Sequence, residues 1–290
     1  MTESIDAHHH LWHYSPQGYP WITDRMRVLH QDFLPPDIAL ELRANNVDGC
    51  IAVQARQTLE ETKTLLGYAE EYAFLRGVVG WAPISSPVFS GLLDELCCHR
   101  KLRGLRHAIQ DEPDQNFILG EDFQRGVKLL GEKGLVYDIL IFEKHLPQVI
   151  AFVDRHPRQT FVLDHIGKPR IAEKLLSPWK KNLRALAQRE NVYCKLSGLV
   201  TEANWSKWTE TDLQPYFDIV MQAFGPRRIM MGSDWPVCLL ASSYSRWMQL
   251  VRKWISTFSI EERERVLGGT AIEAYRLSNI APNPAHGANA

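Results

Sequence analysis

The sequence lacks any long apolar run. None of its 290 residues belongs to a stretch that approaches the roughly 18 apolar residues of a membrane-spanning helix. Residues 1–4 carry neither the basic region nor the apolar core of a signal peptide. Lysine plus arginine (33) nearly balance aspartate plus glutamate (34), so no basic excess for nucleic acid is present. We therefore expect a cytoplasmic protein with no membrane partner and no nucleic-acid partner.

Cysteine is scarce and follows no pattern. The five cysteines are odd in number and contain no C-x-x-C, and one vicinal pair among them is poor material for a disulfide. They are Cys50, Cys97, Cys98, Cys194 and Cys238. We expect all of them to be reduced thiols.

A glycine-rich G-x-G-x-x-G turn is also missing, which disfavours an open doubly wound sheet. Instead, eight short apolar runs alternate with helical patterns, as in an α/β protein of the (β/α)8 TIM-barrel type. The runs are residues 4–11, 47–54, 75–83, 102–109, 135–141, 160–167, 191–199 and 228–237. No linker or internal repeat divides the chain. We predict one barrel domain over residues 1–280, followed by a frayed tail over residues 281–290.

Two helix starts and one irregularity are visible in the sequence. Thr58 with Glu61, and Ser259 with Glu262, have the spacing of capping boxes. The pair at 268–269, two glycines near the C-terminus, is best explained as an irregularity in a helix.

The stretch around which the chain is organised is 4–12, which holds three consecutive histidines. On a strand, His8 and His10 share one face and His9 takes the other. Neutral imidazole is a common ligand of transition metals, so His8 and His10 form half of a candidate metal site. A tag remnant is the alternative, but the flanking residues are apolar and have the character of native sequence.

Polar residues stand at the carboxyl ends of the other runs, where barrel enzymes carry their chemistry. They are Gln54, Trp81, Arg106, His107, Asp138, His165, Lys195 and Asp234. So many polar groups converging at one place are difficult to explain as packing.

Several of these residues have a structural alternative. The alternative for Asp234 is a purely structural role as a helix cap or turn former before Pro236. His165 is expected inside the barrel, with Asp164 pointing the opposite way on a regular strand. Arg106 and His107 cannot both point inward, and we place Arg106 inside, with His107 reaching over from the end of the strand.

Six motifs together resemble the amidohydrolase superfamily, in the branch of sugar-acid lactonases that includes L-fuconolactonase and L-rhamnonolactonase. They lie at 6–12, 80–83, 105–107, 164–169, 195–198 and 232–236, and the resemblance extends to about Leu277.

This resemblance implies that His8, His10 and Asp234 hold one divalent metal ion, zinc in the first instance. It also implies that His165 or Asp234 activates water. Some relatives work without a metal, so metal-independent catalysis stays open. The residues Arg106-His107 and Asp138 stand where other members have further ligands, so a binuclear site is not expected.

The function that follows is hydrolysis of a sugar lactone, with Asp234 and His165 as catalytic residues. Substrate contacts are predicted for Gln54, Trp81, Arg106, His107, Asp138, Lys195 and Trp235. The aromatic loop at 12–21 is expected to pack against the partly apolar face of the sugar, and plain hydrophobic cover over the barrel mouth is its alternative. Two alternatives are a zinc-dependent non-oxidative decarboxylase of the same superfamily and a non-catalytic sugar-binding barrel.

Overall fold

Eight parallel strands form a single sheet in the computed structural model, which describes residues 2–277. The strands pair in chain order from β1 to β8. They are β1 Ile5–His9, β2 Gly49–Val53, β3 Leu75–Gly80, β4 Leu102–Ala108, β5 Val136–Leu140, β6 Phe161–Leu163, β7 Val192–Leu196 and β8 Ile229–Met231. Each strand lies within one of the eight apolar runs, so the predicted (β/α)8 barrel is confirmed.

Backbone contacts between β1 and the segment after β8 close the barrel. A parallel bridge joins His9 to Trp235. Beside it, the amide of His10 donates to the carbonyl of Trp235 at 2.7 Å, and the amide of Asp234 donates to the carbonyl of His8 at 2.8 Å. The barrel is thus closed by the residues that were predicted to carry its chemistry.

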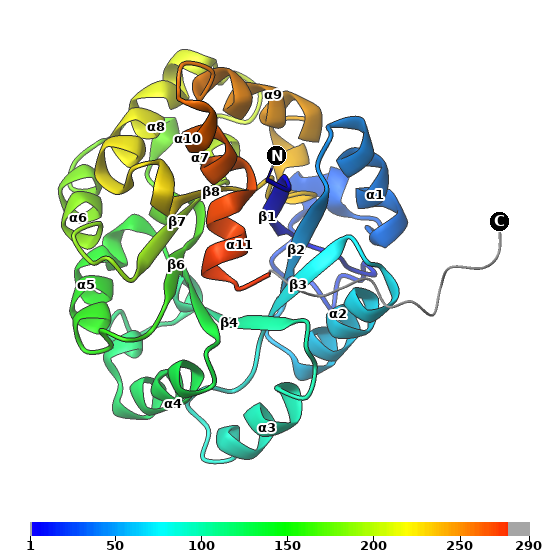
Figure 1. The fold of residues 1–290 in the computed structure, drawn as a ribbon, viewed down its shortest axis with the longest axis vertical. Helices are drawn as coiled ribbons and strands as arrows, with labels where there is room; N and C mark the ends of the chain where they lie inside the picture. The colour runs from blue at the N-terminus through cyan, green and yellow to red at the C-terminus, as the bar shows by residue number, and fades with distance from the viewer. Residues whose placement is uncertain (1, 278–290) are drawn as a thin grey trace.

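Helices surround the barrel, all but the last of them in an outer ring (Figure 1). They are α1 Pro35–Ala44, α2 Leu59–Glu71, α3 Phe89–Leu96, α4 Glu121–Glu132, α5 Leu146–Asp154, α6 Trp179–Leu186, α7 Leu199–Glu202, α8 Glu210–Phe224, α9 Tyr244–Trp254, α10 Ile260–Glu264 and α11 Thr270–Ala274. Short 3-10 turns connect them at Asp24–Leu29, Ile109–Asp111, Phe117–Leu119, Glu143–His145, Asp164–Gly167, Ile171–Glu173, Pro226–Arg228 and Val237–Leu240. A π-helical turn spans Arg265–Gly269.

Two apolar clusters lie on opposite sides of the sheet, because successive residues of a strand face opposite ways. The smaller cluster fills the barrel and includes Ile51, Val162 and Met230. The larger cluster lies between the sheet and the helices and includes Cys50 and Leu163. Members of the inner cluster such as Ile5, Val136 and Val162 precede the polar strand ends, which therefore lie above an apolar plug.

Helix α11 covers the amino-terminal end of the barrel, and in Figure 1 it lies across the barrel axis in red. Its residues Ala271 and Ala274, and Tyr275 directly after it, belong to the inner apolar cluster. The chain therefore closes the floor of its own barrel with its C-terminal helix.

The last helical segment begins as predicted and contains the predicted irregularity. Ser259 Oγ accepts from the amide of Glu262 at 3.2 Å, and the Glu262 carboxylate accepts from the amide of Ser259 at 2.9 Å. Gly268 lies in the π-helical turn, where an added Cβ would be 1.9 Å from the carbonyl oxygen of Glu3. Glycine is required there because the turn passes so close to the start of β1.

The capping box predicted for α2 forms only in part. Thr58 Oγ1 accepts from the amide of Glu61 at 3.2 Å, as predicted. The Glu61 carboxylate does not return to Thr58, however, and accepts from the amides of Ala55 at 3.0 Å and Arg56 at 2.9 Å. This buried carboxylate thereby ties α2 to the loop after β2.

We expect Glu61 to make the stability of the protein fall as the pH rises. Burial raises the pKa of Glu61 to about 7 from its usual value of 4.5, so the folded state binds this proton more tightly than the unfolded state. Between about pH 4.5 and 7 the folded state then holds more protons, and unfolding becomes easier by about 1–3 kcal/mol. In urea unfolding across this range, the free energy of unfolding should depend less on pH for Glu61→Gln than for the wild type. The control is Glu60→Gln, whose side chain is 80 % exposed. Equal profiles for all three proteins would contradict the prediction.

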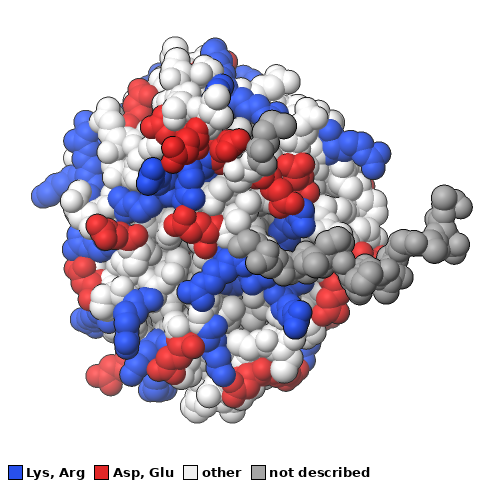
Figure 2. Space-filling model, viewed as in Figure 1, with Lys and Arg blue, Asp and Glu red and all other residues white. Residues whose placement is uncertain are grey.

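Among residues 2–277, no helix is long and apolar enough to cross a membrane. On the face that carries α11, lysine and arginine lie interspersed with aspartate and glutamate (Figure 2). The frayed tail predicted for residues 281–290 lies outside the described residues, and the single domain over residues 1–280 stays a prediction.

Candidate active site

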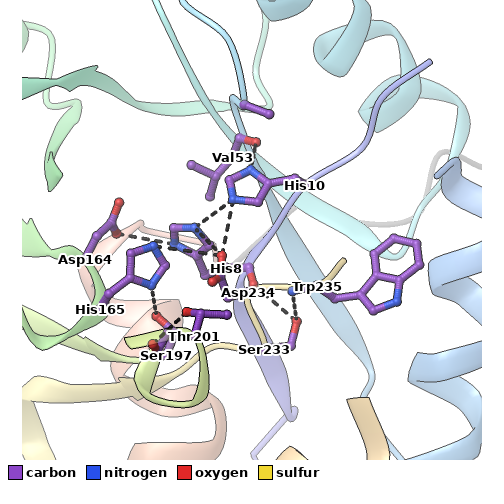
Figure 3. A network of polar contacts seen from close by, with 12 residues as sticks. His8, His10, Val53, Asp164, His165, Ser197, Thr201, Ser233, Asp234 and Trp235 are labelled. Atoms are coloured by element: carbon purple, nitrogen blue, oxygen red, sulfur yellow. Dashed lines mark hydrogen bonds and ion pairs between the residues drawn. The ribbon is translucent and has the colours of Figure 1, made fainter. Parts of the chain in front are cut away.

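Three histidines and two aspartates form a buried cluster at the carboxyl ends of the strands (Figure 3). They are His8, His10, Asp164, His165 and Asp234, and none is more than 5 % exposed. These residues come from the ends of β1, β6 and β8, which are far apart in the sequence. The barrel mouth is therefore where the predicted chemistry assembles.

A bulge in β1 turns both predicted histidines into the barrel. Ala7 faces the inner apolar cluster, so a regular strand would turn His9 inward rather than His8. The pairing of β1 with β2 slips between Asp6 and His9, and Asp6 Oδ1 accepts from the amide of His8 at 3.1 Å. The Nε2 atoms of His8 and His10 then lie 3.2 Å apart, which confirms their predicted convergence.

Each histidine has a partner at Nδ1, while its Nε2 faces Asp234. His10 Nδ1 lies 2.8 Å from the carbonyl oxygen of Val53, which can only accept, so Nδ1 carries the proton and Nε2 presents a lone pair. His165 Nδ1 lies 2.9 Å from Ser197 Oγ, and His8 Nδ1 faces a buried carboxylate at 3.4 Å. Metal-binding histidines are typically oriented in this way.

A left-handed turn after β6 brings Asp164 and His165 to the same side of the sheet. Residues 165–168 all have positive φ, between 46° and 76°. Asp164 was predicted to point away from His165, and this is wrong: Asp164 keeps the inward direction of Val162, while the left-handed backbone redirects His165. Such a conformation costs roughly 1–2 kcal/mol for each non-glycine residue and is found mainly at functional sites.

Asp234 faces all three histidines. Its Oδ1 lies 3.4 Å from His10 Nε2, 3.7 Å from His8 Nε2 and 3.9 Å from His165 Nε2. The alternative of a helix cap or a turn before Pro236 does not describe this carboxylate, which points into the cluster (Figure 3). Burial raises the pKa of Asp234, but the neighbouring imidazoles of His165 and His10 outweigh burial and hold that pKa below its usual value. Asp234 is therefore ionised at neutral pH.

The two Nε2 atoms and the Asp234 oxygen fit a single divalent ion. Their separations are 3.2, 3.4 and 3.7 Å, against roughly 3.4 Å between ligands held about 2.1 Å from a tetrahedral zinc. Burial, together with the charge of Lys195, keeps the pKa of His8 well below its usual value, so His8 is neutral, as a metal ligand must be. Burial also lowers the pKa of His165 to about 4. The three residues predicted to bind the metal, His8, His10 and Asp234, thus lie together in the structure.

Lys195 lies beneath this cluster and does not reach the barrel mouth. Its Nζ is 2.5 Å from Asp138 Oδ2, 3.0 Å from Asp164 Oδ1 and 3.2 Å from His8 Nδ1, and the residue is fully buried. These contacts are all with buried groups below the mouth, so the ammonium does not face a substrate. The predicted contact between Lys195 and the substrate is therefore wrong.

The predicted substrate contact of Asp138 is wrong for a similar reason. Asp138 is fully buried, and both of its carboxylate oxygens accept from the hydroxyl of Tyr275 at 2.8 Å. One of these oxygens also contacts Lys195. Asp138 therefore belongs to the support below the site.

Arg106 points into the barrel, as predicted. Its Nη1 donates to Asp164 Oδ2 at 2.9 Å, and its Nη2 donates to the backbone carbonyl of Gln54. The Gln54 amide in turn donates to the carbonyl of Arg106 at 3.4 Å. Both side chains are nearly buried, so the substrate contacts assigned to them stay predictions.

Trp81 and His107 lie half-buried at the rim. The indole of Trp81 donates to His107 Nδ1 at 3.3 Å, and His107 Nε2 donates to Glu112 at 2.6 Å. Their predicted role in substrate binding agrees with this exposure and stays a prediction. Trp235 does not lie at this rim. Its indole packs against Phe33 and points away from the cluster, so the substrate contact predicted for Trp235 is wrong (Figure 3).

The aromatic loop packs beside His10. The Trp12 ring stacks on His10 at 6.4 Å and meets Tyr19 at 5.5 Å and Trp21 at 5.8 Å. Trp21 is 36 % exposed, so the loop offers an apolar surface next to the cluster.

Sequence reasoning missed three residues around the site. Asp164 had a signal, since it stands two residues after the inward-facing Val162 at the end of a strand. Glu202, in α7, lies close enough to Asp234 for their charges to interact, and burial raises the pKa of Glu202. Tyr275 had no local signal, because only the folded chain brings its helix beneath the site.

Gly198 is predicted to be essential for the position of His165. It has a φ of 72°, and an added Cβ would lie 2.6 Å from His165 Nδ1. We therefore expect Gly198→Ala to displace this ring from Ser197 and to lower kcat by about 10- to 100-fold. The control is Gly91→Ala, in α3, where an added Cβ meets nothing within 4 Å. An unchanged kcat in Gly198→Ala would show that the ring can shift without consequence.

An eight-stranded barrel whose mouth gathers three histidines and two aspartates defines a class of protein: an enzyme that activates water at a candidate metal site. The particular family follows from comparison with known proteins. The chain belongs to the amidohydrolase family, whose model matches residues 5–277.

Its relatives match along nearly the whole chain. An L-fucono-1,5-lactonase from Burkholderia multivorans is 44 % identical over 97 % of both chains. An L-fucono-1,5-lactonase from Burkholderia ambifaria is 34 % identical over 96 % of this chain and 97 % of its own. A crystal structure of an amidohydrolase from Burkholderia multivorans, with bound zinc, has a TM-score of 0.90 and 44 % identity, covering 94 % of this chain and 99 % of its own.

Proposed function

We propose that this protein is a cytoplasmic aldonolactonase. It hydrolyses L-fucono-1,5-lactone, or a closely related L-galactono- or L-rhamnono-lactone, to the free aldonic acid with one bound zinc ion. The observation that carries the proposal is the cluster of His8, His10, His165 and Asp234, held in a chain that matches L-fucono-1,5-lactonases over nearly its full length.

Zinc is supported by this chain's own geometry and by a relative. The ligand atoms of His8, His10 and Asp234 have the spacing that zinc requires, and a structure 44 % identical to this chain contains zinc. When bound, zinc supplies a Lewis acid that polarises the ester carbonyl and lowers the pKa of water.

Asp234 is the proposed proton acceptor. Hydrolysis joins a water oxygen to the lactone carbonyl carbon and breaks the bond from that carbon to the ring oxygen. Asp234 is ionised and can take up a proton, because its Oδ1 faces three histidines and, among residues 2–277, has no lysine or arginine as an ion-pair partner. It takes the proton from water and returns it to the departing ring oxygen, which completes the balance.

His165 orients this exchange. Its Nε2 lies 3.9 Å from Asp234 Oδ1, and Ser197 holds its other nitrogen. The rim residues Trp81 and His107, and the loop that carries Trp21, offer aromatic surfaces. Such surfaces pack well against the partly apolar face of a sugar ring.

A screen of aldonolactones with a pH indicator tests the proposal. We expect acid release from L-fucono-1,5-lactone, loss of activity after treatment with a chelator and recovery with zinc. Release of carbon dioxide from an aromatic acid would instead favour the decarboxylase, and binding of sugar without turnover would favour the non-catalytic barrel.

We expect His8→Ala and His10→Ala to lower lactone hydrolysis by at least about 100-fold while the fold persists, because both residues are metal ligands at the mouth. The matched control is His13→Ala, whose side chain is 63 % exposed and contacts Asp32 and Tyr68. Near-wild-type turnover in both ligand variants would remove the proposed metal site.

A further inference from the structure

A single hydroxyl group links the floor of the barrel to the active site. Tyr275 follows α11, and its side chain is buried in the inner cluster. Its hydroxyl lies 2.8 Å from both carboxylate oxygens of Asp138. The C-terminal helix thus reaches through the apolar plug and donates a hydrogen bond to the charged layer above.

We propose that Tyr275 is a positioning residue for the active site, acting through Asp138 and Lys195 on Asp164 and His8. The part of this proposal that concerns turnover rests on the proposed lactonase function. The part that concerns zinc affinity rests only on the geometry of the metal site.

The chain of contacts is continuous and contains no exposed member. Tyr275 holds Asp138, and Asp138 Oδ2 holds the Lys195 ammonium at 2.5 Å. The same ammonium holds Asp164 Oδ1 at 3.0 Å, and that oxygen faces His8 Nδ1 at 3.4 Å. All of these groups lie in a dry interior, where hydrogen bonds and charges are strong and water cannot replace a lost partner.

The position of Lys195 depends on a balance between two carboxylates. Asp138 pulls the ammonium toward the floor, and Asp164 pulls it toward the cluster. Among the described residues, Tyr275 and Lys195 are the only side chains that donate to Asp138. If the hydroxyl is removed, Asp138 has Lys195 as its one remaining donor, so the ammonium should move toward Asp138 and away from Asp164.

Asp164 determines which nitrogen of His8 carries the proton. A metal ligand at Nε2 requires the proton on Nδ1. Asp164 Oδ1 at 3.4 Å and the Lys195 ammonium at 3.2 Å both face Nδ1, and of the two only the carboxylate can accept that proton. Lys195 fixes that oxygen from below, while Arg106 fixes the other oxygen at 2.9 Å. A shift of Lys195 therefore changes how firmly His8 is held for the metal.

Packing alone does not explain the tyrosine. A phenylalanine would fill the same space in the inner cluster and keep the ring that lies 5.5 Å from the Lys195 ammonium. Only the hydroxyl distinguishes the two residues, and its partner is Asp138. Tyr275→Phe therefore removes one link and leaves the floor filled.

The test compares Tyr275→Phe with a matched variant, Tyr137→Phe. Tyr137 is fully buried and adjoins Asp138 in β5, but it belongs to the outer cluster, and among residues 2–277 its hydroxyl has no side-chain hydrogen-bond partner. For Tyr275→Phe we expect kcat to fall about 10-fold with KM within about twofold, and the zinc dissociation constant to rise about 10-fold in a chelator competition. Tyr137→Phe should change neither quantity.

A double-mutant cycle tests the route. In an Asp138→Asn background, Tyr275→Phe should have little further effect on zinc affinity, because both changes break the same link. Tyr275→Met is a second variant that fills the floor without a hydroxyl, should the phenylalanine variant unfold.

Zinc affinity within about twofold of wild type in Tyr275→Phe, or an undiminished effect in the Asp138→Asn background, would overturn the proposal. Zinc affinity is measured without substrate. If the wild-type protein hydrolyses no lactone, the proposed function is refuted, but the effect of Tyr275→Phe on zinc affinity still decides the present proposal.

Discussion

Asp234→Asn is expected to lower kcat by roughly 10²–10⁴, the range for removal of a positioned proton acceptor. The amide keeps the shape of the side chain and retains an oxygen that can face zinc, so zinc content and thermal stability should largely survive. It loses basicity, and the acid limb of the pH–rate profile should vanish or move. Steady-state kinetics across pH, with zinc measured by elemental analysis, gives the result.

The companion variant is His165→Asn, because His165 is the other group able to take a proton at this position. If Asp234→Asn keeps its rate and acid limb while His165→Asn loses them, His165 is the base and Asp234 only a ligand. If Asp234→Asn unfolds, its carboxylate is needed chiefly for the structure of the segment before Pro236.

Lys195→Met is expected to destabilise the fold by about 3–5 kcal/mol, the usual cost of removing one partner from a buried ion pair. The ammonium lies within 3.0 Å of both Asp138 and Asp164, and all three residues are fully buried. Methionine fills similar space but leaves two carboxylates close together without their shared cation. Urea unfolding measures the loss, and Lys181→Met, at an exposed position in α6, is the control.

Acidity and a second substitution should both reduce the loss. At low pH one carboxylate takes up a proton, so the difference from wild type should shrink as the pH falls. Lys195→Met combined with Asp138→Asn should recover part of the stability for the same reason. If the loss of stability in Lys195→Met is the same at all pH values, its cause is poor packing of the methionine and not the unpaired carboxylates.

The strands were predictable because their apolar runs are short, separate and regular. Each run holds a strand of the barrel, and the polar residues that end β1, β6 and β8 meet at the mouth. His8, His10, His165 and Asp234 were among the polar strand-end residues, since parallel strands bring their carboxyl ends to one edge, and the family resemblance singled out these four.

What the sequence did not reveal depends on departures from regular strands and on distant contacts. The bulge before His8 and the left-handed turn at His165 both change the direction of side chains, and no local pattern of residue types predicts them. The wrong assignments of Lys195 and Asp138 have another cause: a buried cation and its carboxylates look like substrate ligands until their mutual distances are known.

The closure of the barrel between His9 and Trp235 has a consequence for synthesis of the protein. The contact between Ser233 Oγ and the His8 carbonyl spans 225 residues, so at about 5–20 residues per second the first strand waits roughly 10–45 s for its last neighbour to be made. During that time one edge of β1 is unpaired beside three histidines, and Asp234 does not yet exist. A chain that stops before this aspartate lacks a ligand of the proposed site, so loading with zinc would mark a molecule whose translation has passed the eighth strand.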